Sequence, residues 1–392
     1  MRRNFLPIVG LLSLFVLGAC SAERDPKIAS LKHALEVADS QLLDAAAELD
    51  TTNCFPRSLM PKFRAVDAKD WTSGFFPGSL WQCYRFTGDE KLLAEARKYT
   101  DRLEGIQYYK GTHDLGFMVG CPVGLGLRLT GDKAYGRLLV ETSETLLKRF
   151  DPKVGLIRSW DNKNRQPDPY LVIIDNMMNL EMLFEASRLT GDPRFRDVAV
   201  AHANTTLRNH FREDGSAYHI VVYDSATGRV REHRGGQGYS STSAWARGQS
   251  WGLYGFTMCY RETGDARYLA RAVKSAEYIL NHPNLPKDGV PYWDFDRPGE
   301  ERDASAGAVI ASGLLELSEY VPHEQSRRYV RAARRILRSL SSDRYLNAAG
   351  SAHGFLLSHS VGHKPKGSQV DVPIIYADYY FLEALLRYRQ LD

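Results

Sequence analysis

Two aspartates, Asp114 and Asp175, are the residues of this sequence best suited to acid–base chemistry. Asp175 lies within residues 171–180, which read Leu-Val-Ile-Ile-Asp-Asn-Met-Met-Asn-Leu. Because apolar surroundings disfavour a charged carboxylate, we expect a raised pKa that suits a general acid near neutral pH. Asn179, one helical turn later, can hold this carboxyl group. The alternative for each aspartate is a helix cap, but two carboxyl groups at one site favour acid–base work on a sugar.

Aromatic, basic and amide side chains supply the binding surfaces that this chemistry requires. Arg247 lies in Ala-Trp-Ala-Arg-Gly-Gln-Ser-Trp, and its planar guanidinium suits a carboxylate ligand; an internal ion pair is the alternative. His219 and Gln237 lie in predicted loops, and for His219 a structural hydrogen bond is the alternative. Flat faces for stacking against a sugar ring come from four aromatic residues, with core packing as the alternative: Trp71, Trp160, Trp251 and Tyr239.

A five-residue pattern, Arg-x-Thr-Gly-Asp, recurs four times and predicts helical corners. It begins at positions 85, 128, 188 and 261. Glycine ends a helix because it tolerates a left-handed backbone, and aspartate caps the next helix by accepting from its free N–H groups. Pro193, directly after one of these aspartates, fits the first position of a helix. Each pattern therefore predicts one helix ending and the next beginning.

The repeated corners predict an all-α fold, an (α/α)6 barrel of six helical hairpins. Outer helices are expected over 26–48, 89–104, 132–150, 192–209, 265–281 and 323–340, and the last two inner helices over 304–320 and 372–389. An open α-solenoid is the alternative. Long connections at 51–70, 151–170, 211–243 and 341–370 favour the barrel, with loops and short β-strands, such as residues 219–223, over one mouth.

The register of the repeat brings scattered residues to that mouth. Counting back 15 or 16 residues from the threonine of each corner reaches Trp71, Asp114, Asp175 and Arg247. Each position is about four to five turns before its corner, so each begins an inner helix. In a closed barrel these helix starts meet at one end. The matching positions of the last two repeats are Asp303 and Asp371.

The start of the chain predicts export and a lipid anchor. Residues 1–19 hold two arginines and an apolar stretch too short to span a membrane, and Leu-Gly-Ala-Cys at 17–20 resembles a bacterial lipobox. We expect residues 1–19 to be a signal peptide and Cys20 to be lipidated; a plain secretory signal is the alternative. Ser21 favours the outer membrane of a Gram-negative bacterium, so we expect a periplasm-facing or surface lipoprotein whose residues 21–392 form one catalytic domain.

Composition and residue spacing argue against nucleic acid, metal ions and further membrane contact as partners. The 392 residues carry 51 Lys and Arg against 47 Asp and Glu, a net charge of +4 without a basic run, which argues against nucleic-acid binding. No membrane contact beyond the lipid is expected. His359 and His363 lack a carboxylate at ligand spacing, so we predict no metal and no cofactor. The remaining cysteines are too widely spaced for zinc, and we expect buried free thiols: Cys54, Cys83, Cys121 and Cys259.

From about residue 30 to 390, the chain resembles the unsaturated glucuronyl hydrolases of glycoside hydrolase family 88. The resemblance rests on Asp-Trp-Thr-Ser-Gly-Phe-Phe-Pro-Gly at 70–78, His-Asp-Leu-Gly-Phe at 113–117, the segments around Asp175 and Arg247, and Asp371 with Tyr-Ala-Asp-Tyr-Tyr at 376–380. It implies an (α/α)6 barrel with Asp114 and Asp175 as the catalytic pair. The substrate contacts that it implies are Trp71, Trp160, His219, Gln237, Arg247 and Trp251. To these we add His113, and Lys366 and Ser368 from the loop at 359–368, whose basic residues can meet a sulfate; a solvated loop is the alternative there.

The implied substrate is a di- or oligosaccharide that ends in a 4,5-unsaturated uronic acid, of chondroitin, hyaluronan or heparin type. The implied reaction is hydration of the vinyl ether, with Asp175 protonating C4 and then activating water, and Asp114 holding ring hydroxyls. One alternative is an unsaturated rhamnogalacturonyl hydrolase acting on pectin fragments. His219 and the run at 247–251 favour the glucuronyl type. Another alternative is a glycan-binding lipoprotein without catalysis, against which the presence of both aspartates argues.

Overall fold

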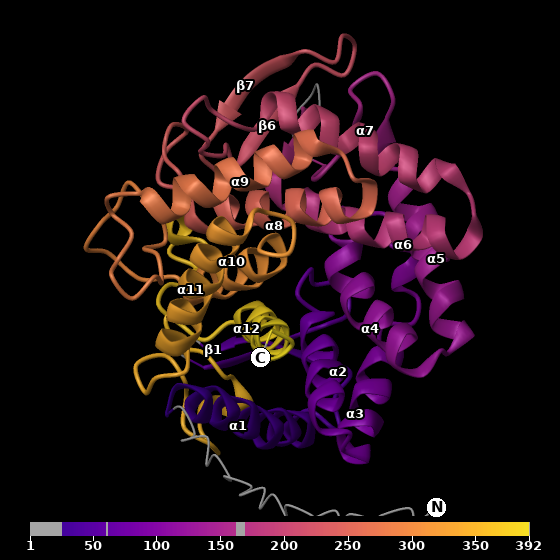
Figure 1. Ribbon diagram of the computed structural model, residues 1–392. Coiled ribbons are helices and arrows are strands. Elements are labelled where there is room, and N and C mark those ends of the chain that lie inside the picture. Colours follow the sequence, from indigo (N-terminus) through magenta and orange to yellow (C-terminus); the bar gives the residue numbers. More distant parts are fainter. Residues whose placement is uncertain (1–25, 60–61, 162–168, 392) are drawn as a thin grey trace, which may run out of the picture.

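The computed structural model describes residues 26–59, 62–161 and 169–391, and within them the helices form a closed double ring (Figure 1). The expected signal peptide and Cys20 lie outside the described residues. The inner helices are α2 (Phe75–Thr87), α4 (Cys121–Thr130), α6 (Leu180–Thr190), α8 (Ala246–Thr263), α10 (Ala304–Leu317) and α12 (Ile375–Arg389). The outer helices are α1 (Pro26–Glu48), α3 (Glu90–Asp101), α5 (Lys133–Leu147), α7 (Pro193–Asn209), α9 (Ala266–Asn281) and α11 (His323–Leu340).

The ring closes because its last inner helix packs on its first. Helix α12 contacts α2 on one side and α10 on the other, and α10 in turn packs against α8. Figure 1 shows successive hairpins following one another around a common centre. The predicted (α/α)6 barrel is confirmed, and the open solenoid was the wrong alternative. No helix within the described residues is long and apolar enough to cross a membrane.

The four corners have the predicted chemistry, and their threonine has a role as well. In the second corner, Gly131 adopts φ 68°, and Asp132 accepts from the backbone N–H of Ala134 at 2.9 Å. The Thr130 hydroxyl donates to the carbonyl of Gly126 and accepts from the N–H of Asp132. The same bonds recur in the corners that contain Thr87, Thr190 and Thr263. Threonine therefore joins the end of one helix to the cap of the next.

Short strands lie in the long connections at the other end of the hairpins. β5 (Tyr170–Ile173), β6 (Ile220–Tyr223) and β7 (Val230–Arg234) form an antiparallel sheet, and β6 confirms the predicted strand at 219–223. Ile173 pairs with Ile220, and the backbone N–H of Ile174 donates to the carbonyl of His219 at 3.0 Å. The sheet thereby fixes His219 beside the start of the next helix. Two hairpins complete the described strands: β1 (Phe55–Leu59) with β2 (Phe63–Val66), and β3 (Phe150–Asp151) with β4 (Leu156–Ile157).

Three inner helices begin later than the repeat predicts. Trp71 lies in a turn four residues before α2, and a π-helical segment, η2 (Gly116–Gly120), separates Asp114 from α4. Asp175 lies in a 3₁₀ segment, η3 (Ile174–Asn179), ahead of α6. Such irregular turns leave backbone groups outside the regular helix ladder and are frequent at functional sites. Arg247, by contrast, is in the first turn of α8 as predicted.

The cysteines only partly follow the prediction. Cys83 and Cys259 are buried, whereas Cys54 and Cys121 are half-buried, and all four are free thiols within the described chain. Cys54 lies just before β1, in the connection between α1 and β1.

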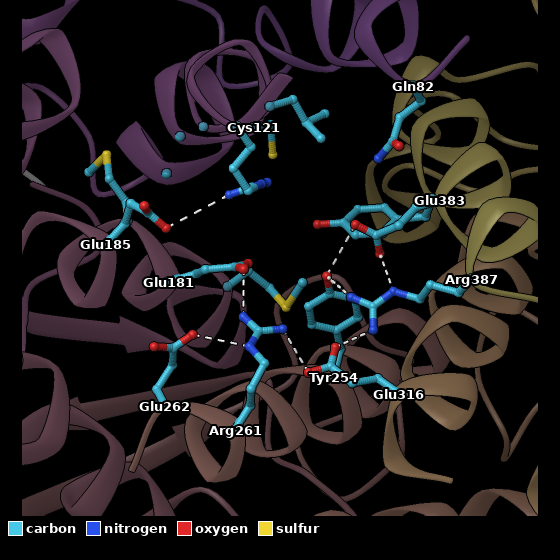
Figure 2. Close-up of a pocket in the computed structure, with 18 of the residues that line it drawn as sticks. Gln82, Cys121, Glu181, Glu185, Tyr254, Arg261, Glu262, Glu316, Glu383 and Arg387 are labelled. Atoms are coloured by element: carbon cyan, nitrogen blue, oxygen red, sulfur yellow. Dashed lines mark hydrogen bonds and ion pairs between the residues drawn. The ribbon is translucent and has the colours of Figure 1, made fainter. Parts of the chain in front are cut away.

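The arginine of the corner pattern lines a cavity of about 390 Å³ at the end of the barrel where the inner helices terminate (Figure 2). Arg261 contacts Glu181 at 2.6 Å and Glu316 at 2.7 Å, and Glu316 also pairs with Arg387. Glu383 accepts from the Ser312 hydroxyl at 2.5 Å. Because these charges neutralise one another, the cavity is a poor candidate for the chemistry that the sequence predicts, and we place the candidate active site at the opposite end.

Candidate active site

Asp175 is a buried carboxyl group, and one of its oxygens is uncommitted. Its side chain is 8% exposed, and Oδ2 has no hydrogen-bond partner among the described residues. Burial raises its pKa to about 7; the Arg247 guanidinium opposes this shift, and the Asp114 carboxylate adds to it. The group therefore exchanges its proton near neutral pH, as a general acid that later acts as a base must do.

His219 faces Asp175 as a neutral imidazole. Burial lowers the pKa of His219 to about 3, and its Nε2 lies 3.6 Å from Asp175 Oδ2. The backbone N–H of Gln237 donates to His219 Nδ1 at 2.9 Å. The Gly235 carbonyl oxygen also lies 3.2 Å from Nδ1, so the backbone fixes the orientation of the ring without fixing its tautomer. His219 therefore presents Nε2 toward Asp175 and the space beside it.

The Arg247 guanidinium is held by contacts within the protein and is not a free group waiting for a carboxylate ligand. Its Nη1 contacts Asp303 Oδ2 at 3.1 Å, and its Nη2 donates to Gln237 Oε1 at 2.7 Å. The two nitrogens also donate to the backbone carbonyls of Val361 and Gly362. The alternative of an ion pair inside the barrel is thus what the structure contains. Arg247 fixes Gln237 and the loop after residue 359, and only its buried Nε lacks a partner among the described residues.

Asp114 lies on the next repeat toward the start of the chain, held by its neighbours. The Thr112 hydroxyl donates to Asp114 Oδ2 at 2.5 Å, and His113 Nε2 lies 3.3 Å from Oδ1. Burial lowers the pKa of His113, so this ring is neutral at physiological pH. His113 is fully buried beneath the aspartate, where it can position Asp114 but offers little surface to a ligand.

Asn179 does not hold the Asp175 carboxyl group. Its Oδ1 accepts instead from the backbone N–H of Phe117 at 3.1 Å, and Gly116 packs directly against its backbone. A side chain on Gly116 would overlap the Cα of Asn179. The expected hydrogen bond is therefore wrong, because the 3₁₀ turn directs Asn179 toward the neighbouring helix start. There it joins the segments that carry Asp114 and Asp175.

Three tryptophans differ in their access to this site. Trp71 is half-buried and lies 5.1 Å from the Tyr376 ring and 5.6 Å from Phe117, so part of its face stays open. Trp160, also half-buried, lies edge-on to His219 at 6.2 Å. Trp251 is fully buried, and its indole N–H is close enough to Asp175 to lower the pKa of that carboxyl slightly. Trp71 and Trp160 can offer stacking surfaces, whereas Trp251 belongs to the buried base of the site.

Lys366 and Ser368 are carried by a tight hairpin over the same end. His363 pairs with Ser368, and Ser360 with Val372. Lys366 is exposed and Ser368 half-buried. Burial, the Lys366 ammonium and the Arg247 guanidinium together lower the pKa of His363, which places this loop beside Arg247. The loop therefore borders the site. Within the described structure it makes no contact with Asp114 or Asp175.

Two residues near the centre were only partly identified from the sequence. Trp245 lies between His219, at 4.4 Å between ring centroids, and the Arg247 guanidinium, at 4.4 Å from the ring. Tyr376 is buried beside Arg247 and Trp71, and burial raises its pKa to about 12. The sequence signal for Trp245 and Tyr376 was their position within the motifs around Arg247 and at 376–380. Asp371, which the register placed at this mouth, is exposed and pairs with His359 at 2.7 Å instead of facing the aspartates.

Several buried polar atoms at this site lack a partner within the described residues. They include Asp175 Oδ2, His219 Nε2, which lies 3.6 Å from it, Trp251 Nε1 and Arg247 Nε. Because buried polar groups are nearly always hydrogen-bonded, uncommitted polar atoms at one mouth indicate a ligand site. No three His, Cys, Asp or Glu side chains of the described residues are arranged to hold a metal ion.

A helical barrel with two aspartates and aromatic side chains at one mouth defines the general class of a sugar-cleaving enzyme. Residues 47–384 match the family described as Glycosyl Hydrolase Family 88, and the chain belongs to that family. An unsaturated glucuronyl hydrolase of Formosa agariphila is 45% identical over 346 residues, 86% of each chain. Another from a Bacillus species is 35% identical over 338 residues, 83% of this chain and 88% of the other.

Solved structures agree with this assignment. An unsaturated glucuronyl hydrolase specific for heparin superposes with a TM-score of 0.89 at 46% identity, covering 93% of this chain and 98% of that one. An aspartate-to-asparagine mutant of the Streptococcus agalactiae enzyme, in complex with dGlcA-GalNAc6S, superposes with a TM-score of 0.76 at 30% identity, covering 93% of each chain. The fold and the family resemblance predicted from the sequence are both confirmed.

Proposed function

We propose that this chain is an unsaturated glucuronyl hydrolase that removes a 4,5-unsaturated uronic acid from the end of a glycosaminoglycan fragment. The observation that carries the proposal is Asp175, a buried carboxyl group with a pKa of about 7 and a free oxygen that lies 3.6 Å from His219 Nε2. Membership of family 88 and the likeness to unsaturated glucuronyl hydrolases support the same reaction.

The chemistry requires one group that is first an acid and then a base. Protonated Asp175 gives its proton to C4, and the C4–C5 double-bond electrons form the new C–H bond. The positive charge at C5 is shared with the ring oxygen. Water then adds at C5 while the Asp175 carboxylate takes its proton, which restores the acid. The resulting hemiketal opens to a C5 ketone, and collapse at C1 releases the neighbouring sugar with its oxygen.

The surrounding side chains have separate tasks in this proposal. Ionised Asp114 holds ring hydroxyls and stabilises the positive charge that develops at C5. His219 Nε2 and the Gln237 side chain, which Arg247 fixes in place, orient the uronate. Trp71 and Trp160 flank the sugar ring, and Lys366 and Ser368 stand where a sulfate on the next sugar can reach them.

The test is a panel of unsaturated disaccharides from heparin, chondroitin, hyaluronan and pectin, followed by the loss of ultraviolet absorbance of the double bond. The heparin-derived disaccharide is the first to try, because a heparin-specific enzyme is among the similar structures. We expect turnover of a glycosaminoglycan disaccharide. Turnover of the pectin-derived substrate alone would favour the rhamnogalacturonyl alternative, and no bleaching of any substrate would favour a glycan-binding protein.

The role of Asp175 is tested by Asp175→Asn, which keeps the size of the side chain and removes its acid. We expect turnover to fall by at least about a thousandfold, because protonation of C4 has no substitute, with substrate binding by calorimetry largely retained. Asp44→Asn, an exchange on outer helix α1, serves as the control. Turnover of Asp175→Asn near that of the wild type would refute the assignment.

We also propose that the mature chain is an outer-membrane lipoprotein of a Gram-negative bacterium, periplasm-facing or on the surface, attached through Cys20. The lipobox-like Leu-Gly-Ala-Cys at 17–20 supports this. Metabolic labelling with radioactive palmitate should mark the wild type and leave Cys20→Ala unlabelled, with the wild type in the membrane fraction. Unlabelled wild-type protein in the periplasmic fraction would instead indicate a plain secretory signal.

A further inference from the structure

Tyr239 is an exposed aromatic residue on a loop that the structure holds firmly. The residue belongs to the loop that connects β7 to α8. It is 53% exposed, whereas most large aromatic residues of the described chain are buried. Its backbone N–H donates to Asp294 Oδ2 at 2.9 Å, and the Ser243 hydroxyl donates to the same oxygen at 2.8 Å. Folding therefore places an apolar ring in solvent and fixes the backbone beneath it.

The loop also carries a residue of the active site. Gln237, two positions before Tyr239, donates its backbone N–H to His219 and accepts from Arg247. Two residues span at most about 7.6 Å between Cα atoms. Because Gln237 contacts both His219 and Arg247, the backbone of Tyr239 lies close to the residues that surround Asp175. The proposed reaction itself does not use the Tyr239 ring.

One face of the Tyr239 ring is supported by a charged network. The Arg297 guanidinium lies 4.4 Å from the ring centroid, and Arg297 Nε donates to Glu300 at 2.6 Å. Lys364 Nζ lies 2.8 Å from Glu300, and its ammonium lowers the pKa of Glu300 to about 2. This chain of contacts joins the Tyr239 loop to the loop that carries Lys366 and Ser368. Glu300 therefore stays ionised at physiological pH, and the rest of the Tyr239 ring is left uncovered.

We propose that Tyr239, backed by Arg297, is a stacking platform for a sugar on the leaving-group side of the bond that is cleaved. A tyrosine has few side-chain torsions to fix and a flat apolar face, which suits the C–H face of a sugar ring. This inference rests on the proposed function, since it assigns the part of the substrate that follows the uronate. It gives the enzyme a means of selecting longer fragments without a basic surface.

The test compares three substrates: the methyl glycoside of the unsaturated uronate, the disaccharide and the tetrasaccharide. For Tyr239→Ala we expect KM to rise about fivefold or more for the disaccharide, the tetrasaccharide or both, and to change less than twofold for the methyl glycoside. Tyr239→Phe, which keeps the ring, should behave as the wild type. Tyr108→Ala is the matched control, because Tyr108 is 63% exposed and contacts Glu141 on the outer helix α5.

The outcomes separate this inference from the proposed function. Equal KM changes for all three substrates would show that Tyr239 acts by supporting Gln237 and Arg247, and unchanged KM values would show no contact; either result overturns the platform. Melting temperatures of the variants confirm that an effect is not unfolding. If the wild type turns over none of the substrates, the proposed function fails first, and the assay then reports on that instead of on Tyr239.

Discussion

The Asp175 carboxyl group is buried and yet exchanges its proton near neutral pH, and both properties come from its neighbours. Its position after a buried strand removes water, and Arg247 and Asp114 act on it with opposite signs. His219 Nε2 lies 3.6 Å from the uncommitted oxygen, and the indole N–H of Trp251 lowers the pKa of the same carboxyl group. Burial of this carboxyl group costs folding stability, and the raised pKa that results suits acid–base chemistry.

This burial predicts a pH-dependent gain of stability for Asp175→Asn. The pKa of Asp175 is raised from 3.8 to about 7 on folding, so the native state binds a proton that the unfolded chain has already released. Stability of the wild type should therefore fall as pH rises from about 4 to about 7, and the variant should lack this fall.

Melting temperatures measured at intervals between pH 4 and pH 8 check the sign. The difference in favour of Asp175→Asn should grow across this range and level off above pH 7. The catalytic activity of the wild type should decline over the upper part of the same range, as the acid loses its proton. A difference in melting temperature that shrinks with rising pH would contradict the burial argument.

Arg247 is a positioning residue as much as a ligand for the uronate. Replacement by alanine leaves the fully buried Asp303 without its cation and releases Gln237 and the loop carbonyls. We expect Arg247→Ala to lose about 3 kcal/mol of stability as well as to raise KM, because removal of one partner leaves an uncompensated buried charge. Urea unfolding with parallel kinetics measures both. A raised KM with unchanged unfolding would show that substrate contact is its whole role.

At the scale of single elements, the corners make a clear contrast between two glycines of one hairpin. Gly131 ends α4 with φ 68°, and a side chain there meets no neighbour within 4 Å. Gly136 lies inside α5, where an added Cβ meets only Leu127 at 3.8 Å. The two sites differ in backbone conformation and hardly at all in packing.

Substitution by alanine should therefore act in opposite directions at these positions. Gly131→Ala should destabilise by about 1 kcal/mol through left-handed strain, and Gly136→Ala should stabilise by about 0.5–1 kcal/mol through helix propensity. Chemical denaturation of both variants gives the comparison, and turnover should be unaffected in each. The same sign for the two substitutions would mean that the corner does not impose its conformation.

Over the whole molecule, the two ends of the barrel divide stability from catalysis. The mouth contains titratable groups with free atoms, while the far end contains charges that neutralise one another around the ends of the inner helices (Figure 2). Phe117, Trp251 and Tyr380 pack between these regions. We therefore expect the charged end to stabilise the ring without contacting the substrate.

Glu316→Gln tests this division. Glu316 is buried between Arg261 and Arg387, so loss of its charge removes the carboxylate that the two cations share and leaves them to Glu181, Glu262 and Glu383, and we expect a loss of about 3 kcal/mol. Because the site lies at the opposite end, KM and kcat below the melting temperature should stay within twofold of the wild type. Glu319→Gln, on the exposed rim of the same cavity, is the control. Impaired kinetics in folded Glu316→Gln would show that the ends are coupled.

The sequence by itself determined the order of helices, the corners and the register that brings Asp114, Asp175 and Arg247 to one mouth. These features follow from local rules, since caps, left-handed glycines and helical periodicity depend on neighbours within one turn. The apolar run around Asp175 also predicted its raised pKa, because that shift arises mainly from burial. The family resemblance added the chemistry.

Only the tertiary structure decided which partner each polar group would choose. Arg247 pairs with Asp303, Asn179 bonds Phe117 across a helix start, and Asp371 turns outward to His359. These contacts join residues that are 12 to 62 positions apart, and the 3₁₀ and π-helical turns that orient Asn179 and Phe117 are not revealed by periodicity. A pattern can place a side chain at the mouth, whereas its hydrogen bonds depend on angles and distances that exist only once the ring has closed.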